Sequence, residues 1–178
     1  RVLLGFEGNF GKWDYKTGVS YAQSTTKTKL TDGYSYTDKL YAALATGIIN
    51  PWVGAGQGQT EAAKQLIEST KFRGAFQHGK TTLTQIDGSV SGELFQLPAG
   101  AVAMAAGFDL RREGYSFEQD VDANLILLAP GNAALQDVSR NVKAVYAELL
   151  VPIMKDLEMQ LALRRDDYSL VGASTNPK

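Results

Sequence analysis

The chain contains no cysteine and only one histidine, His78. Without cysteine it has no disulfides and no thiol chemistry, and the usual zinc sites, which are built from Cys and His, are excluded as well. No run of about 18 apolar residues occurs, so a transmembrane helix is not expected. The formal net charge is −1, and the basic surface that would indicate a nucleic-acid partner is therefore missing.

Alternation of apolar and polar residues is what the sequence has instead, and this period of two predicts β-strands. In the segment that begins at Trp13, the residues Tyr15, Val19 and Tyr21 share one face, while Asp14 and its alternates occupy the other. Six segments follow this pattern and predict an all-β, antiparallel up-and-down meander of six strands. They are residues 2–10, 13–24, 81–94, 101–111, 141–151 and 157–165.

The connections between these segments alternate between short and long. Tight turns are predicted near Gly11, at 98–100 and at 152–156, whereas long loops are predicted near 25–71 and 115–140. In a meander all the short turns then lie at one end of the sheet and all the long loops at the other. This asymmetry is typical of outer-membrane barrels.

The longer loop also carries two helix signals. Thr37 and Thr60 are each predicted to cap a short helix, and Gly47 is predicted to end the first one. Between the helices, the glycines of VGAGQGQ mimic a phosphate-binding loop but lack its full spacing, so a plain loop is expected. The second long loop includes Pro130 and Gly131, which are typical loop residues.

Strand length and aromatic spacing favour a membrane-spanning sheet. A tilted strand needs about 9–11 residues to cross a bilayer, and the alternation persists for ten or more residues in 81–94 and 101–111. Trp13 and Tyr21 are eight positions apart on one face, which corresponds to roughly 20 Å of height for a tilted strand. Such a separation suits aromatic girdles at the two interfaces of a membrane, with Val102, Met104, Ala106, Phe108 and Leu110 directed into the lipid.

The opposite face of the predicted strands is rich in charge. It is interpreted as the wet lumen of a barrel, where side chains face a plug domain or a ligand, although a solvated sheet face would carry the same pattern. The cluster from Asp109 to Glu113 has no nucleophile or cofactor loop beside it, so an ion-pair ladder is the simpler reading and no catalytic, cofactor-binding or metal-binding residue is predicted. His78 is expected to be an exposed rim residue. The candidate lumen residues are Asp87, Glu93, Asp109, Arg111, Glu113, Glu158 and Arg164.

Two stretches resemble the barrel domain of TonB-dependent outer-membrane receptors. They are GELFQLPAGAVAMAAGFDLRREGYS and VKAVYAELLVPIMKDLEMQLALRRDDYSLVGASTNPK, in which residues 94–113 and 144–178 match the family's order and spacing of motifs. In that family a Leu-Phe-x-Leu-Pro-Ala-Gly turn leads into a strand that ends in an Arg-Arg-Glu-like cluster, and a later strand ends in Arg-x-Asp-Asp-Tyr-Ser. The Ile-Asn-Pro-Trp run at 49–52 also resembles the family's Asn-Pro-aromatic loop element.

The resemblance implies a place in a barrel of about 22 strands, of which this chain is expected to form about a quarter, without the plug. It implies energised uptake of a scarce nutrient across the outer membrane of a Gram-negative bacterium. The implied partners are membrane lipid, the receptor's own plug and remaining strands, and the TonB system. An iron chelate, cobalamin and an oligosaccharide all remain open as substrate. Two alternatives also remain open: a soluble all-β binding or structural module with packed apolar faces, and a passive porin-type barrel.

Overall fold

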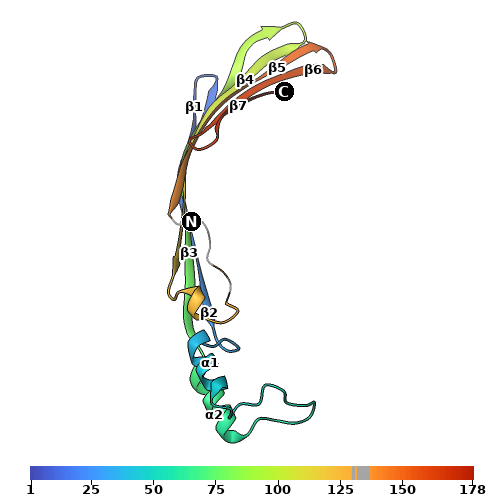
Figure 1. Ribbon diagram of the computed structural model, residues 1–178. Coiled ribbons are helices and arrows are strands. Elements are labelled where there is room, and N and C mark those ends of the chain that lie inside the picture. Colours follow the sequence, from blue (N-terminus) through green and yellow to red (C-terminus); the bar gives the residue numbers. More distant parts are fainter. Residues whose placement is uncertain (130, 132–136) are drawn as a thin grey trace. The chain divides into compact units, whose positions relative to one another are not determined.

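The computed structural model describes residues 1–129, 131 and 137–178, and its seven strands form one antiparallel sheet in strict sequence order (Figure 1). This arrangement confirms the predicted all-β up-and-down meander, but the sheet has seven strands and the prediction of six was wrong. The strands are β1 Val2–Phe10, β2 Trp13–Leu30, β3 Gly74–Leu97, β4 Gly100–Gln119, β5 Val138–Met154, β6 Leu157–Tyr168 and β7 Gly172–Pro177.

The additional strand and the extra strand length come from segments that lack a clean apolar alternation. In β7, polar and small residues pair with β6 through their backbones, from Tyr168 opposite Gly172 to Leu163 opposite Pro177. Strand β2 continues to Leu30 through a threonine-rich stretch, and β-branched residues favour extended backbone whether or not one face is buried. The long connections therefore cover 31–73 and 120–137, and the described part of the second consists of 120–129, 131 and 137.

Helix is confined to the two long connections, as α1 Thr37–Ala45, α2 Glu61–Thr70 and a short 3-10 turn at Ala123–Leu125. The predicted cap at Thr60 is confirmed, because its hydroxyl accepts a hydrogen bond from the Ala63 amide at 3.2 Å. The predicted cap at Thr37 is wrong: Thr37 is the first helical residue, and Tyr36 at the cap position makes no side-chain bond. Gly47 ends α1 with a φ of +71°, as expected.

The described residues divide into two compact units. The first contains residues 1–24, 80–115 and 137–178, and the second contains 25–79 and the described residues of 116–131. Strands β2, β3 and β4 contribute residues to both units. No helix in the part of the chain that the structure describes is of the length and apolarity needed to cross a membrane.

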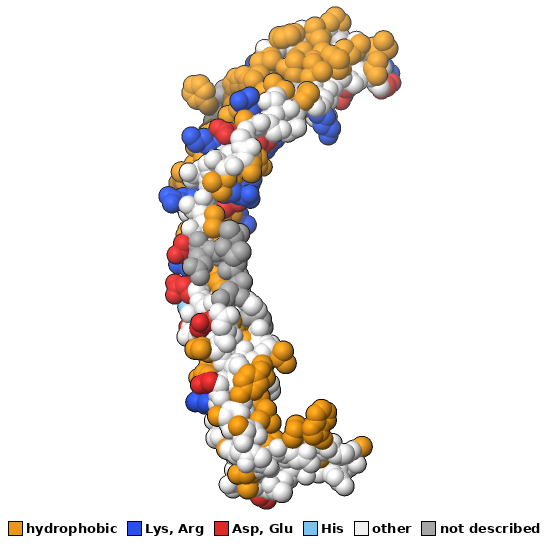
Figure 2. All heavy atoms as spheres, in the orientation of Figure 1, with side chains coloured by type: hydrophobic (Ala, Val, Ile, Leu, Met, Phe, Trp, Pro, Cys, Tyr) orange, Lys and Arg blue, Asp and Glu red, His pale blue; other side chains and the backbone are white. Residues whose placement is uncertain are grey.

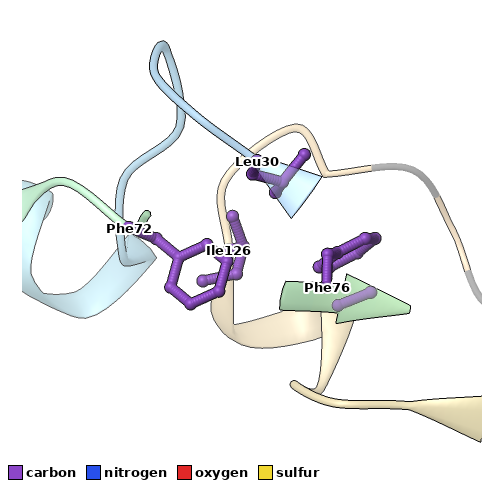
Figure 3. Close-up of a cluster of buried hydrophobic side chains, with 5 residues drawn as sticks. Leu30, Phe72, Phe76 and Ile126 are labelled. Atoms are coloured by element: carbon purple, nitrogen blue, oxygen red, sulfur yellow. The ribbon is translucent and has the colours of Figure 1, made fainter. Parts of the chain in front are cut away.

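The second unit has its own small hydrophobic cores. Leu30 from β2, Phe72, Phe76 from β3 and Ile126 converge with Ala123 into one buried cluster (Figure 3). Tyr36 packs its ring edge-on against Phe72, with the ring centroids 5.5 Å apart. A second cluster of Ala43, Ile49 and Ala63 joins α1 to α2. These clusters explain how a connection as long as 31–73 is held together by apolar contacts of its own.

In the first unit the three predicted tight turns are confirmed. Strand β3 ends at Leu97 and β4 begins at Gly100, whose φ of +146° a side chain would disfavour. The turn between β5 and β6 lies at Lys155 and Asp156, after a bulge between Pro152 and Met154. The registers of β4–β5 and β5–β6 then fix which residues share a face, because side chains alternate strictly along each strand.

Candidate functional site

The pairing registers bring the predicted lumen residues of β4 and β6 onto one face of the first unit. Asp109 lies opposite Ala144, which lies opposite Asp166, so the odd residues of β4 share a face with the even residues of β5 and β6. Asp109, Arg111, Glu113, Glu158 and Arg164 all belong to this set. We call this surface the polar face.

A hydrogen-bonded node joins β3 to β4 on the polar face. The Gln85 amide donates to Asp87 Oδ1 at 3.3 Å and to Asp109 Oδ2 at 3.1 Å, so it holds the two predicted carboxylates together. The other carboxylate oxygen of Asp109 is buried and has no hydrogen-bond partner among the described residues. A buried acceptor without a partner is costly, so this oxygen can accept a hydrogen bond from a donor outside the described residues.

Above this node, Glu113 lies between two arginines. Arg140 Nε of β5 donates to Glu113 Oε2 at 2.6 Å, a short charge-assisted bond. Arg111 Nε lies 3.2 Å from Glu113 Oε1, but it is buried and has no partner with hydrogen-bond geometry. The contact of Arg111 with Glu113 is therefore an ion pair without hydrogen-bond geometry. The hydrogen bond to Glu113 comes from Arg140.

A third charged group lies on β6. Arg164 forms a forked contact with Asp166 through Nε and a terminal nitrogen, with distances from 2.9 to 3.1 Å. The guanidinium also lies 6.0 Å from the ring centroid of Tyr146, at the outer limit of a cation–π contact. Asp166 is only 7% exposed, although the Arg164 side chain is half-exposed, so the Asp166 carboxylate is the more enclosed member of this pair.

Towards the short turns the polar face is hollowed into a pocket of about 680 Å³. Predicted residue Glu93 lines it together with Asp14 and Glu148, while Lys12 and Gln160 provide the hydrogen-bond donors. The pocket thus carries three carboxylates and one cation, and its field favours cationic or hydroxyl groups. Glu158 does not line this pocket and makes no ion pair among the described residues, so the structure does not bring it together with the other candidates.

The opposite face of the first unit, which we call the apolar face, is exposed and hydrophobic. Leu4 is 60% exposed, Val145 is 55% exposed and Leu161 is 49% exposed, although each lies within a paired strand. Figure 2 shows hydrophobic side chains gathered over the β4–β6 end of the sheet. Of the residues predicted to point outward from β4, Phe108 and Leu110 are exposed and Met104 and Ala106 are half-buried, but Val102 is 2% exposed and is covered by its neighbours.

Aromatic rings lie against glycines on both faces. On the apolar face the Phe108 ring lies on Gly88 and the Trp13 ring on Gly92, while on the polar face Tyr146 lies on Gly107. A glycine leaves room for a ring to lie flat against the neighbouring backbone, which shields the ladder hydrogen bonds there. Trp13 therefore has a packing role that the sequence pattern did not indicate.

The second unit carries a separate group of charges, which we call the loop ion cluster. Lys71 Nζ lies 2.9 Å from Asp32 Oδ1 and 3.1 Å from Glu68 Oε2, and Arg73 contacts both carboxylates. The hydrogen bond from Lys71 lowers the pKa of Asp32, and the hydrogen bond from Arg73 lowers the pKa of Glu68. The same contacts raise the pKa of Lys71 and of Arg73. The cluster ties both ends of the 31–73 connection to each other.

His78 is less isolated than the sequence indicates. Its Nε2 lies 3.3 Å from a carboxylate oxygen of Glu118, which is in β4. Its Nδ1 lies 3.4 Å from a carboxylate oxygen of Asp120, which directly follows β4. Each ring nitrogen therefore faces a carboxylate. The sequence pattern gave no indication of these contacts, because Glu118 and Asp120 lie about 40 positions from His78. The side chain is 36% exposed, so His78 is half-buried where an exposed residue was predicted.

The chemistry of the charged groups is that of a wall lined by ion pairs. Within the described residues, no group of three or more His, Asp and Glu side chains is placed to hold a metal ion. The members of the pairs Arg140–Glu113 and Arg164–Asp166 neutralise each other across or along strands. The ion-pair ladder predicted for 109–113 is present only in part, because Arg111 lies near Glu113 but neither Asp109 nor Arg112 makes an ion pair among the described residues. The predicted candidate set did not include Gln85, Arg140, Tyr146 or Asp166, although all four lie on the same face as its members.

No protein-family model, curated protein or solved structure matches this chain.

Proposed function

We propose that the strands of the first unit cross the outer membrane of a Gram-negative bacterium as part of the barrel of a TonB-dependent receptor. One observation carries the proposal: the register separates a continuous, exposed apolar face from a face of hydrogen-bonded charges. A soluble sandwich would need a second layer over the apolar residues. A bilayer supplies that cover without further chain.

The dimensions of the apolar face support the same proposal. On β4 the outward residues run from Val102 to Leu110, which is about 26 Å along the strand and about 20 Å of height at a tilt of 40°. An outer-membrane barrel has an apolar band about 25 Å tall. The three tight turns that join β1–β2, β3–β4 and β5–β6 lie at one end of the strands, and the two long connections leave from the other. The separation is less complete than predicted, because the short connection 169–171 between β6 and β7 also lies at the end of the long connections.

In this proposal the polar face lines the lumen and serves energised uptake of a bulky nutrient. The ion pairs of Glu113 and Asp166 give a wall of fixed, mutually compensated charges that a polar solute can pass without meeting a bare charge. The unpartnered oxygen of Asp109 and the acidic pocket around Glu93 are the positions with acceptors to offer. They are where the plug or the solute would contact this wall.

The test compares arginine substitutions on the two faces of one strand in the full-length protein. Phe108→Arg places a cation in the apolar band and should cost roughly 2–4 kcal/mol near the bilayer midplane. Ala105→Arg is the matched control: it lies opposite Glu148 and lines the acidic pocket, so its charge is compensated. The measurement is outer-membrane assembly, together with urea unfolding after refolding into lipid vesicles.

A depth series separates the membrane from a soluble sandwich, because both penalise Phe108→Arg. On β2 the penalty for arginine should be smaller at Tyr21 than at Val19, since Tyr21 lies nearer the rim of the band. In a sandwich the penalty would instead follow packing density. A penalty that is equal at the two positions and unaffected by bilayer thickness would overturn the membrane proposal.

A further inference from the structure

The rim of the apolar face, on the side of the long connections, is lined by cations. Along β4 the outward residues run apolar to Leu110, and the next outward residue is Arg112. Along β5, read towards its start, the apolar run ends at Val145 and the next outward residue is Lys143, and along β6 it ends at Leu163 and is followed by Arg165. Three neighbouring strands thus each end their apolar band with a positive charge.

These cations are available for a partner. Arg112, Lys143 and Arg165 are all exposed, and none of them forms an ion pair with an acid among the described residues. Lys143 lies directly opposite Asp167 in the β5–β6 register, yet no ion pair is formed between them. Arg165 makes a single neutral hydrogen bond, to the Thr175 hydroxyl at 3.3 Å. Figure 2 shows Lys and Arg side chains bordering the hydrophobic surface of this region.

An apolar groove opens directly beside this row of cations. It has a volume of about 510 Å³ and is lined by Tyr15, Gly88, Val90, Ala106, Phe108 and Val145. The small side chain of Ala106 fills little of this surface, whereas the space above Gly88 is taken by the Phe108 ring. Val145, on its edge, is the register partner of Arg165, so the groove and the cations adjoin.

We propose that this surface is a binding site for an anionic, phosphate-bearing lipid, with the phosphate on Arg112, Lys143 and Arg165 and an acyl chain in the groove. The inference rests on the proposed function, because it requires the apolar face to meet lipid. Guanidinium and ammonium groups are strong phosphate donors, and cations that flank a membrane surface favour anionic headgroups. An apolar groove next to unpaired cations is complementary to both parts of such a lipid.

The experiment measures lipid retention by the full-length protein with native mass spectrometry. The probes are phosphatidylglycerol and phosphatidylcholine with identical acyl chains. The variant is Arg112→Gln/Lys143→Gln/Arg165→Gln, and the control is Lys12→Gln/Lys64→Gln/Lys155→Gln, which removes the same charge from two of the short turns and from α2. The preference for phosphatidylglycerol should fall roughly 10- to 100-fold in the variant and stay unchanged in the control.

Three results would overturn the inference. They are an unchanged preference in the triple variant, an equal loss in the control, or a wild-type protein that enters bilayers of both lipids but retains them equally. Ala106→Leu, which fills the groove, should lower retention of both lipids alike, and undiminished retention would overturn the role of the groove. If the wild-type protein fails to float with vesicles of either lipid, the membrane proposal itself fails.

Discussion

Gly107 lies where its neighbours leave no space for a side chain. A Cβ built at this position would lie 2.6 Å from the Gly88 carbonyl oxygen and 2.5 Å from the Tyr146 hydroxyl. Real Cβ atoms do not come this close to backbone, and the Gly88 carbonyl cannot rotate away as a side chain would. The residue therefore holds β3 and β4 at a separation that only glycine allows.

We expect Gly107→Ala to destabilise the sheet by about 1–3 kcal/mol, as overpacking of a filled site does. Gly18→Ala is the matched control within the same sheet, because its Cβ would meet nothing closer than 3.6 Å. Urea unfolding of the protein refolded in lipid vesicles measures both. Equal stabilities for the two variants would contradict the close approach of β3 to β4.

Individual residues also mark the limit of what the sequence predicts. Alternation correctly gave the face of Asp109, Arg111 and Glu113, because side-chain direction follows strand parity alone. It did not give the hydrogen bond from Arg140 to Glu113, which depends on register across a long connection. The same holds for Gln85: its parity was visible, but its bridge to Asp109 required the offset between β3 and β4.

At the scale of elements, the helices of the 31–73 connection differ in how they begin. Helix α2 has a hydroxyl cap at Thr60, whereas α1 begins after Tyr36 with no side-chain cap. We expect Thr60→Ala to cost about 1 kcal/mol of local stability through the lost N-cap bond. Thr37→Ala should have little effect, since Thr37 makes no cap. Hydrogen exchange of the amides in 61–70 and 37–45 measures each helix separately, and a larger loss for Thr37→Ala would contradict the assigned helix starts.

The loop ion cluster predicts an acid-sensitive element. The pKa values of Asp32 and Glu68 are lowered below their ordinary values of 3.8 and 4.5. A lowered folded-state pKa stabilises the element above the ordinary value, and this contribution is lost as the pH falls through the lowered one. Protection of residues 32–73 from hydrogen exchange should therefore hold from neutral pH to about 5 and decline below about 4.

A substitution separates this cluster from general acid unfolding. Lys71→Met removes the cation that contacts both Asp32 and Glu68 while keeping much of the side-chain volume. The variant should be less protected at pH 7 and should lose less protection on acidification. Lys64→Met is the control, because Lys64 pairs only with Glu61 on the exposed surface of α2. An identical pH profile in Lys71→Met and wild type would rule out the cluster as the cause.

The strand boundaries show why some strands were predicted from the sequence and others were missed. Segments with apolar alternation, such as 101–111, were found because one face must avoid water. Strand β7 is fully exposed, so it has no buried face to leave a signal, and only its pairing with β6 defines it. The upper part of β2 up to Leu30 was likewise missed, because its threonines favour extended backbone without alternation.

At the scale of the whole chain, the exposed apolar face and the two edge strands predict its behaviour in water. Strands β1 and β7 each have one strand neighbour, and unpaired edges together with a large apolar surface promote association. We expect the isolated 178-residue chain to self-associate in buffer and to become dispersed in detergent micelles. Light scattering measures this, and a stable monomer in buffer would favour the soluble module over the membrane barrel.

The sequential strand order also sets the route by which the sheet can assemble. Every strand pairs only with its neighbours in the chain, so assembly can proceed by adding one hairpin at a time. The costliest closure is between β2 and β3, where residues 31–73 replace a two-residue turn, at roughly 3 kcal/mol of additional chain entropy. The cluster of Leu30, Phe72 and Phe76 lies where that loop closes. We expect the burial of this cluster to bring β2 and β3 together before their remaining residues pair, so that folding at this junction starts from the loop.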